Sequence, residues 1–212
     1  MIIKIVCASN DTFSKMYRHD EDEFLIGVDA GVDVLIKNRL PIDLAIGDFD
    51  SSKTKDISSK VKEIAIYPAE KSKSDLELAI NYVFSPEFQQ RFAFRCAAEK
   101  VIIYNATGKR LDHYHATINL LIRYTHLPIE ILDNHNHFYV VNSRTVFKKG
   151  RYKYVSFFAI DPKTIITLEG FKYDITGYQL GQLDNLCLSN EIVEKEGILM
   201  TNNKKILVIQ SE

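Results

Sequence analysis

Short, uninterrupted apolar runs in the first 127 residues are the feature that most constrains the fold. Five such runs alternate with longer segments of helical pattern: IIKIVC (2–7), FLIGV (24–28), DLAIG (43–47), EIAIY (63–67) and KVIIY (100–104). Strands that are apolar at nearly every position are typical of a parallel sheet covered by helices on both faces. The pattern therefore predicts an α/β domain with a mostly parallel sheet.

Two of the intervening segments carry clear helix signals. In residues 74–83, apolar side chains recur at the spacing of one helix face, and Ser74 and Glu77 have the spacing of a capping box. The second helix is expected at 112–125, before a proline that disfavours helical geometry in the preceding residue. Ser74 is thus the predicted N-cap, which places Asp75 in the first helical turn.

The pattern changes after residue 127. Over residues 128–212, short strands such as FYVV, TIITLEG and KKILVIQ are separated by polar turns. This spacing predicts an antiparallel sandwich or barrel, with hairpin turns at Lys149-Gly150 and Asn202-Asn203. The change of period predicts two domains, at residues 1–127 and 128–212.

Charge and cysteine content exclude several classes of protein. The chain has 27 basic and 28 acidic residues, for a formal net charge of -1, so its overall field favours neither nucleic acid nor an anionic membrane. Cys7, Cys96 and Cys187 are far apart and form no CxxC pair, which argues against a disulfide framework and a structural zinc site. With no signal peptide and no apolar span of membrane length, the sequence predicts a cytoplasmic protein.

Two aspartates follow the third apolar run, in the stretch LAIGDFDSSK. Asp48 and Asp50 are two positions apart, so in an extended segment they point to the same side, roughly 6.5 to 7 Å apart along the chain. Carboxylates placed in this way repel unless a cation lies between them, and Mg²⁺ is a hard ion that takes oxygen ligands. The alternative is a polar turn, because glycine, aspartate and serine are ordinary turn residues.

Aspartates also stand at three other junctions between strands and helices, namely Asp29, Asp75 and Asp112. For the last two, a purely structural role is a strong alternative, because an acidic residue in the first turn complements the helix dipole. Four junctions between strands and helices that each carry an aspartate are nevertheless more than helix capping alone explains. Since the carboxyl ends of parallel strands open on one edge of the sheet, the sequence predicts that these aspartates face one cleft.

Binding of phosphate beside acidic groups also requires donors. Basic residues flank the same junctions, and glycines there allow backbone N–H groups to approach an anion. These residues are Lys71, Lys73, Lys109 and Arg110, with Gly31, Gly47 and Gly108. Each basic residue taken singly fits a solvated surface charge equally well, and ATGKR lacks the first glycine of a P-loop.

The histidines give weaker signals than the aspartates. His113 and His115 are two positions apart on a predicted helix and do not share a face, which argues against a metal pair. His135 and His137 could ligate a metal in an extended segment, but a polar turn between strands is the favoured interpretation. We therefore place no metal site on histidine.

Four motifs in order, GVDAG, GDFDSS, KSKSDLELAI and NATGKRLDH, followed by an all-β tail with LSNE, resemble the thiamine pyrophosphokinase family. The resemblance covers nearly the whole chain. It implies a Rossmann-like N-terminal α/β domain that binds ATP and a smaller C-terminal antiparallel β-sandwich that binds thiamine. It further implies a homodimer with active sites between subunits.

The reaction that the resemblance implies is Mg²⁺-dependent transfer of the pyrophosphoryl group of ATP to the hydroxyethyl oxygen of thiamine, giving thiamine diphosphate and AMP. By matching motifs, Asp48, Asp50 and Asp75 would hold Mg²⁺ and the triphosphate, and Asp112 would complete the catalytic set. The nucleotide-binding residues would be Asp29, Gly31, Gly47, Ser51, Lys73, Ser74, Arg110 and His113. Tyr173, Ser189 and Asn190 lie in the segment where family members bind the vitamin.

The sequence departs from the family pattern at three positions. Ala30 stands in place of a glycine, Ser74 replaces the usual threonine, and Asn105 replaces the glycine that opens the fourth motif. Serine keeps a hydroxyl and the helix cap. Asparagine tolerates left-handed backbone angles better than most residues.

Two other functions fit a cleft of aspartates. A metal-dependent phosphohydrolase would use water as the nucleophile in place of thiamine. A nucleotide-sensing or structural module would bind ATP without turnover. The products formed with and without thiamine distinguish the three hypotheses.

Overall fold

The computed structural model describes residues 1–8, 13–50, 52, 56–68, 72–92, 98–108 and 110–212. The chain forms two compact units: Met1–Leu120 with Ile131–Asn134, and Leu121–Glu130 with His135–Glu212. It is a mixed α/β protein with a large, mostly parallel sheet and a smaller antiparallel sheet. The predicted α/β class is confirmed at this level.

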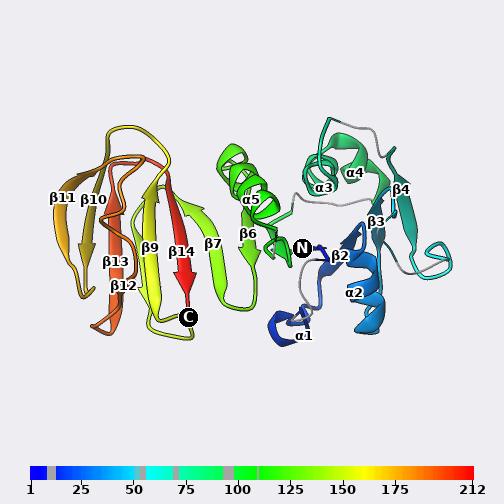
Figure 1. The fold of residues 1–212 in the computed structure, drawn as a ribbon, viewed down its shortest axis with the longest axis horizontal. Coiled ribbons are helices and arrows are strands. Elements are labelled where there is room, and N and C mark those ends of the chain that lie inside the picture. Colours follow the sequence, from blue (N-terminus) through cyan, green and yellow to red (C-terminus); the bar gives the residue numbers. More distant parts are fainter. Residues whose placement is uncertain (9–12, 51, 53–55, 69–71, 93–97, 109) are drawn as a thin grey trace. The chain divides into compact units, whose positions relative to one another are not determined.

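Parallel strands form the sheet of the first unit (Figure 1). They are β1 (Ile2–Val6), β2 (Glu23–Val28), β3 (Leu44–Gly47), β4 (Glu63–Ile66) and β5 (Lys100–Tyr104). Neighbouring strands pair in the order β5-β1-β2-β3-β4. These are the five apolar runs of the sequence, so the prediction of a parallel sheet is confirmed. β6 (Ile129–Leu132) follows β5 in the strand order.

The helices of this part of the chain are α1 (Phe13–Met16), α2 (Gly31–Lys37), α3 (Asp75–Val83), α4 (Pro86–Arg91) and α5 (Leu111–Arg123). The predicted cap of α3 is confirmed, because the Ser74 hydroxyl accepts a hydrogen bond from the Glu77 amide at 3.2 Å. Apolar side chains of α1, α2, β1, β2 and β3 form one core, which includes Val6, Phe13 and Leu35. No helix in the described residues is long and apolar enough to cross a membrane.

The second unit is built from antiparallel strands. They are β7 (Asn136–Val141), β8 (Thr145–Lys148), β9 (Tyr154–Ala159), β10 (Thr164–Glu169), β11 (Ile175–Leu180), β12 (Asn190–Glu191), β13 (Glu196–Thr201) and β14 (Ile206–Ser211). β7, β9, β12 and β14 belong to the larger of the two sheets already described, and β8, β10, β11 and β13 form the smaller one. Strands of both sheets contribute to one core, in which the rings of Phe147, Phe157 and Phe171 contact one another.

Both predicted hairpins are wrong. Lys149-Gly150 connects β8 to β9, but β8 pairs with β13, whereas β9 pairs with β12 and β14. Asn202-Asn203 connects β13 to β14, which lie in different sheets. The polar turns mark where the chain reverses, but the strands on either side find partners elsewhere, as in the connections of a two-sheet protein.

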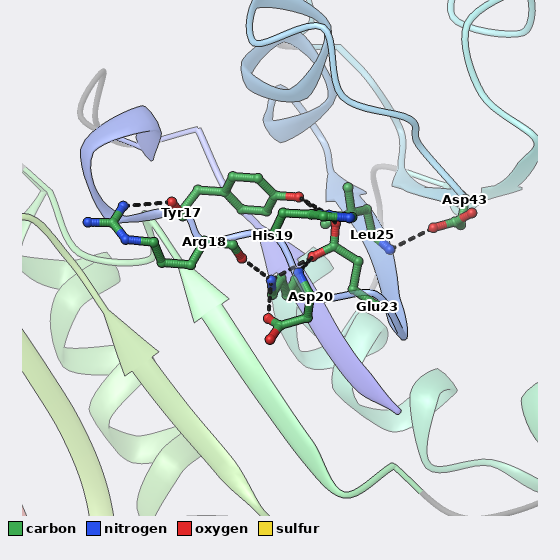
Figure 2. A network of polar contacts seen from close by, with 8 residues as sticks. Tyr17, Arg18, His19, Asp20, Glu23, Leu25 and Asp43 are labelled. Atoms are coloured by element: carbon green, nitrogen blue, oxygen red, sulfur yellow. Dashed lines mark hydrogen bonds and ion pairs between the residues drawn. The ribbon is translucent and has the colours of Figure 1, made fainter.

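A buried ionic network ties β1 to the segment that leads into β2. The ammonium group of Lys4, whose side chain is fully buried, lies 2.6 Å from Glu23 Oε2 and 2.6 Å from Asp20 Oδ2, and it also donates to the Arg18 carbonyl. Figure 2 shows the side chains of Tyr17, His19 and Glu23 pointing toward one another, with the Tyr17 hydroxyl donating to Glu23. Burial alone would raise the pKa of Glu23, but these hydrogen bonds outweigh it and lower the pKa.

We expect the Lys4→Met variant to lose about 3 to 5 kcal/mol of unfolding free energy, because Glu23 would remain as a buried carboxylate without its main cation. Urea denaturation of the variant and the parent measures this loss. The matched control is Arg91→Met, which breaks the more exposed Arg91–Glu63 pair and should cost no more than about 1 kcal/mol. Equal losses in the two variants would contradict the role assigned to Lys4.

Candidate active site

Three strands of the first unit end in left-handed backbone. Asp29 follows β2 with φ 48°, Phe49 follows β3 with φ 60°, and Asn105 follows β5 with φ 58°. Residues with side chains rarely adopt these angles, at a cost of about 1 to 3 kcal/mol each. Such strain clusters at functional sites, and here the strained residues lie where the chain turns at the carboxyl edge of the sheet. Asn105 has the left-handed φ angle that asparagine tolerates better than most residues.

Three carboxylates gather at this edge. One oxygen from each of Asp29, Asp48 and Asp50 lies within 4.8 Å of the others. The ends of β2 and β3 hold them together, because the Asp29 amide donates to the Ile46 carbonyl at 2.8 Å. A Cβ at Gly47, where φ is 150°, would lie 3.1 Å from the Asp29 Cα, so glycine allows the two strand ends to approach.

Electrostatics at this cluster favour a cation. Burial raises the pKa of Asp29, the Ala30 amide lowers it, and the charges of Asp50, Asp75 and Asp48 raise it further. Asp29 Oδ1 is buried without a hydrogen-bond partner among the described residues. An unsatisfied oxygen beside two more carboxylates is the donor set that a hard divalent cation takes. The cluster therefore fits a divalent metal.

A cavity of about 440 Å³ opens beside the cluster. Asp29, Asp75 and Ser74 line it from the strand and helix ends, while Arg110 and His113 line it from the start of α5. Burial, with the charges of Asp29 and Asp75, raises the pKa of the Cys7 thiol in the cavity wall to about 12. The cavity therefore combines a negative field with the side chains of Ser74, Arg110 and His113, which can donate to phosphate oxygens.

Arg110 is already ion-paired. Its Nη2 lies 2.5 Å from Asp112 Oδ2, and both side chains are exposed. The hydrogen bond from Arg110 lowers the pKa of Asp112 to about 2. Asp112 is therefore placed to orient the guanidinium at the cavity mouth, although Asp112 itself is not among the lining residues.

The remaining residues predicted for this site lie in different positions. Gly31 begins α2, where a Cβ would lie 1.9 Å from the Val6 carbonyl, so its glycine permits close packing of helix on strand. Gly108 lines the cavity, and Lys73 is exposed before α3. Ser51, Lys71 and Lys109 lie outside the described residues.

The three residues predicted for vitamin binding lie in the second unit. Asn190 is buried, and its side chain both accepts from the Tyr173 amide at 3.0 Å and donates to the Tyr173 carbonyl at 2.9 Å. The Ser189 amide donates to Ser156 Oγ at 2.9 Å, in left-handed backbone. Asn190 thus shapes the segment, whereas the Tyr173 ring is 60% exposed.

Sequence reasoning missed three polar residues that hold the turn between β5 and α5. Thr107 donates to Asp133 at 2.5 Å, and Thr117 donates to the Ala106 carbonyl at 3.2 Å. All three are buried. The polar pair Asp133-Asn134 directly after β6 is the one sequence signal that points to Asp133.

Comparison with known proteins matches two family models to successive parts of the chain. The protein-family model for the catalytic domain of thiamin pyrophosphokinase matches residues 17–132. The family model for the vitamin B1 binding domain of thiamin pyrophosphokinase matches residues 144–207. The chain belongs to the thiamin pyrophosphokinase family. The family resemblance of the four motifs and the prediction of a thiamine diphosphokinase are therefore confirmed.

Members of this family from several bacteria match the chain over nearly its whole length. The thiamine pyrophosphokinase of Bacillus subtilis (strain 168) is 28% identical over 201 residues, covering 91% of this chain and 89% of the relative. The crystal structure of thiamin pyrophosphokinase from Geobacillus thermodenitrificans is 30% identical with a TM-score of 0.79, covering 100% and 98% of the two chains. A thiamin pyrophosphokinase family protein from Enterococcus faecalis is 26% identical with a TM-score of 0.81, covering 100% and 99%.

For this thiamin pyrophosphokinase family member, we expect Asp29→Asn to raise the melting temperature in metal-free buffer. The substitution removes one of three mutually repelling carboxylates. The same variant should show a smaller rise in melting temperature when Mg²⁺ is added, since a ligand stabilises only through the site that binds it. Asp56→Asn, at an exposed aspartate bonded to Ser58 and Ser59, is the control. A lower metal-free melting temperature for Asp29→Asn would contradict the repulsion.

We also expect Asp112 to stay ionised down to about pH 2 in the folded protein. Because this pKa is depressed, the stabilisation is fully present above the unfolded value near 3.9 and is lost as pH falls toward 2. Carboxyl carbon shifts in an NMR titration measure the pKa. In Arg110→Gln the pKa should return toward its ordinary value, and an unchanged pKa there would show that Arg110 is not the cause.

Proposed function

We propose that this protein transfers the pyrophosphoryl group of ATP to the hydroxyethyl oxygen of thiamine, giving thiamine diphosphate and AMP. The observation that carries the proposal is the set of three carboxylates, within 4.8 Å of one another, beside a cavity of about 440 Å³ that Asp29 shares with Asp75 and Arg110. Such a site suits a metal-bound triphosphate, and membership of the family selects thiamine as the acceptor.

Asp48, Asp50 and Asp75 are the proposed ligands of Mg²⁺, and the geometry adds Asp29 to them. When bound, the ion would neutralise the charge that builds up on the phosphate oxygens during transfer. The aspartates fix where the triphosphate lies. Asp29 contributes a buried oxygen without a hydrogen-bond partner among the described residues to this proposed set.

The donors proposed for the nucleotide surround this acidic set. Arg110, oriented by Asp112, and His113 reach the cavity from the start of α5, and Ser74 reaches it from the cap of α3. Positive side chains near the transferred group lower the barrier by stabilising charge in the transition state. The remaining proposed nucleotide-binding residues are Gly31, Gly47, Ser51 and Lys73.

In the proposed reaction, the hydroxyl oxygen of thiamine attacks the β-phosphorus of ATP. A bond forms between them as the bond from the β-phosphorus to the bridging oxygen breaks, and AMP leaves with the electron pair. The hydroxyl proton passes to a carboxylate oxygen, for which Asp48 or Asp50 is the proposed acceptor. The chain thus supplies positioning and proton transfer.

We assign ATP binding and catalysis to residues 1–127 in a Rossmann-like domain, and thiamine binding to residues 128–212 in a β-sandwich. Tyr173, Ser189 and Asn190 are the proposed contacts of the vitamin. The exposed Tyr173 ring offers a π-face to the cationic thiazolium. We further propose a cytoplasmic homodimer with active sites between subunits.

The decisive assay incubates the protein with Mg-ATP, with and without thiamine, and quantifies AMP, thiamine diphosphate and inorganic phosphate. We expect AMP and thiamine diphosphate in equal amounts, and only when thiamine is present. Asp50→Asn should lose roughly 10²-fold or more in kcat, because an electrostatic contact made in the transition state is removed. Asp56→Asn should keep the parent rate.

The same assay tests the alternative functions. Phosphate release without thiamine would identify a metal-dependent phosphohydrolase, since the acidic cluster suits water as a nucleophile equally well. Binding of ATP with no product, unchanged by Asp50→Asn, would identify a module without catalysis. Either result would overturn the proposed reaction.

A further inference from the structure

The described residues between β5 and α5, 105–108 and 110, supply part of the cavity wall and belong to neither element. Asn105, Ala106, Gly108 and Arg110 all line the cavity. Asn105 is fully buried in left-handed backbone, a conformation that costs free energy and persists only where the surroundings enforce it. The position of Arg110 therefore depends on whatever holds this turn.

Two hydrogen bonds from buried threonine hydroxyls hold this turn. Thr107 Oγ1 donates to Asp133 Oδ2 at 2.5 Å, and Thr117 Oγ1, on α5, donates to the Ala106 carbonyl at 3.2 Å. The relative exposures of Thr107, Thr117 and Asp133 are 5%, 4% and 7%. The first bond joins the turn to the residue that follows β6, and the second joins it to its own helix.

A carboxylate is a demanding group to bury in this position. Its desolvation costs several kcal/mol unless hydrogen bonds replace the lost water, and an apolar side chain after β6 would avoid the cost. The acceptor bond that Asp133 makes is short and charge-assisted, roughly twice as strong as a neutral one. Burial, with the charge of Asp133, also raises the pKa of Tyr114 on α5, so the carboxylate faces the helix as well as the turn.

Asp133 does not line the cavity, and so it acts through the turn. Thr107 lies two residues after Asn105 and three before Arg110, so a fixed Thr107 limits where both can lie. We propose that Asp133 is a positioning residue for ATP, which holds Asn105–Gly108 through Thr107 so that Arg110 meets the phosphates. The inference rests on the proposed use of this cavity for ATP.

The test compares variants of Thr107 with a matched control. Thr107→Val removes the hydroxyl at nearly constant volume, and Thr107→Ser retains it. The control is Thr164→Val in the second unit, where a fully buried threonine donates to the Asp161 carbonyl at 2.7 Å. Both valine variants lose one buried hydrogen bond and should lose similar thermal stability.

The readouts are calorimetric affinity for Mg²⁺ with α,β-methylene ATP, and the separate KM values for ATP and thiamine. We expect Thr107→Val to weaken nucleotide affinity about tenfold and to raise the KM for ATP similarly, because small misplacements of binding groups are costly. The KM for thiamine should stay within about twofold. Thr107→Ser should bind within about threefold of the parent.

Asp133→Asn is the second variant, for use if Thr107→Val folds poorly. It keeps an acceptor oxygen and removes the charge, so we expect an affinity between those of Thr107→Ser and Thr107→Val. Affinity in Thr107→Val equal to that in Thr164→Val, or Asp133→Asn indistinguishable from the parent, would overturn the positioning role. Failure of the parent protein to bind the analogue would overturn the ATP site itself, a separate result.

Discussion

Repulsion among the carboxylates at the ends of β2 and β3 is the constraint on which the rest of the structure depends. Asp29, Asp48 and Asp50 lie within 4.8 Å of one another, an arrangement that a chain without a bound cation holds only against its own charge. The neighbouring strands make this possible, because their backbone hydrogen bonds fix the strand ends. Gly47 completes the arrangement by letting β3 approach Asp29.

Burial of the apolar core stabilises the fold enough to offset the unfavourable free energy of the acidic cluster and its strained turns. β1 and β3 are buried along almost their whole length, and burial of apolar surface offsets strained turns and unsatisfied oxygens above them. The buried positive charge of Lys4 is likewise balanced by the carboxylates of Glu23 and Asp20. Asp29, Phe49 and Asn105 carry left-handed strain at the carboxyl edge of this sheet, beside the site for which we propose catalysis.

Buried polar side chains divide into two kinds in this protein. Asn190 and Thr117 satisfy backbone groups and so define the shape of a turn. Asp133 instead places a carboxylate in the interior, where it accepts a hydrogen bond from the Thr107 hydroxyl, and burying a carboxylate costs more free energy than burying a neutral amide or hydroxyl. Thr107, the partner of Asp133, is next in the chain to Ala106 and Gly108, which line the cavity together with Arg110.

The sequence by itself determined the local features: the five apolar strands, the Ser74 cap, and the aspartates at strand ends, because these follow from periodicity and capping within a few residues. It also indicated the family through ordered motifs. Tertiary structure decided the rest. The partners of β8 and β13 lie far along the chain, so polar turns misled the hairpin predictions, and Thr107 meets Asp133 across 26 positions. Such pairings depend on how strands are ordered in a sheet, which no local pattern encodes.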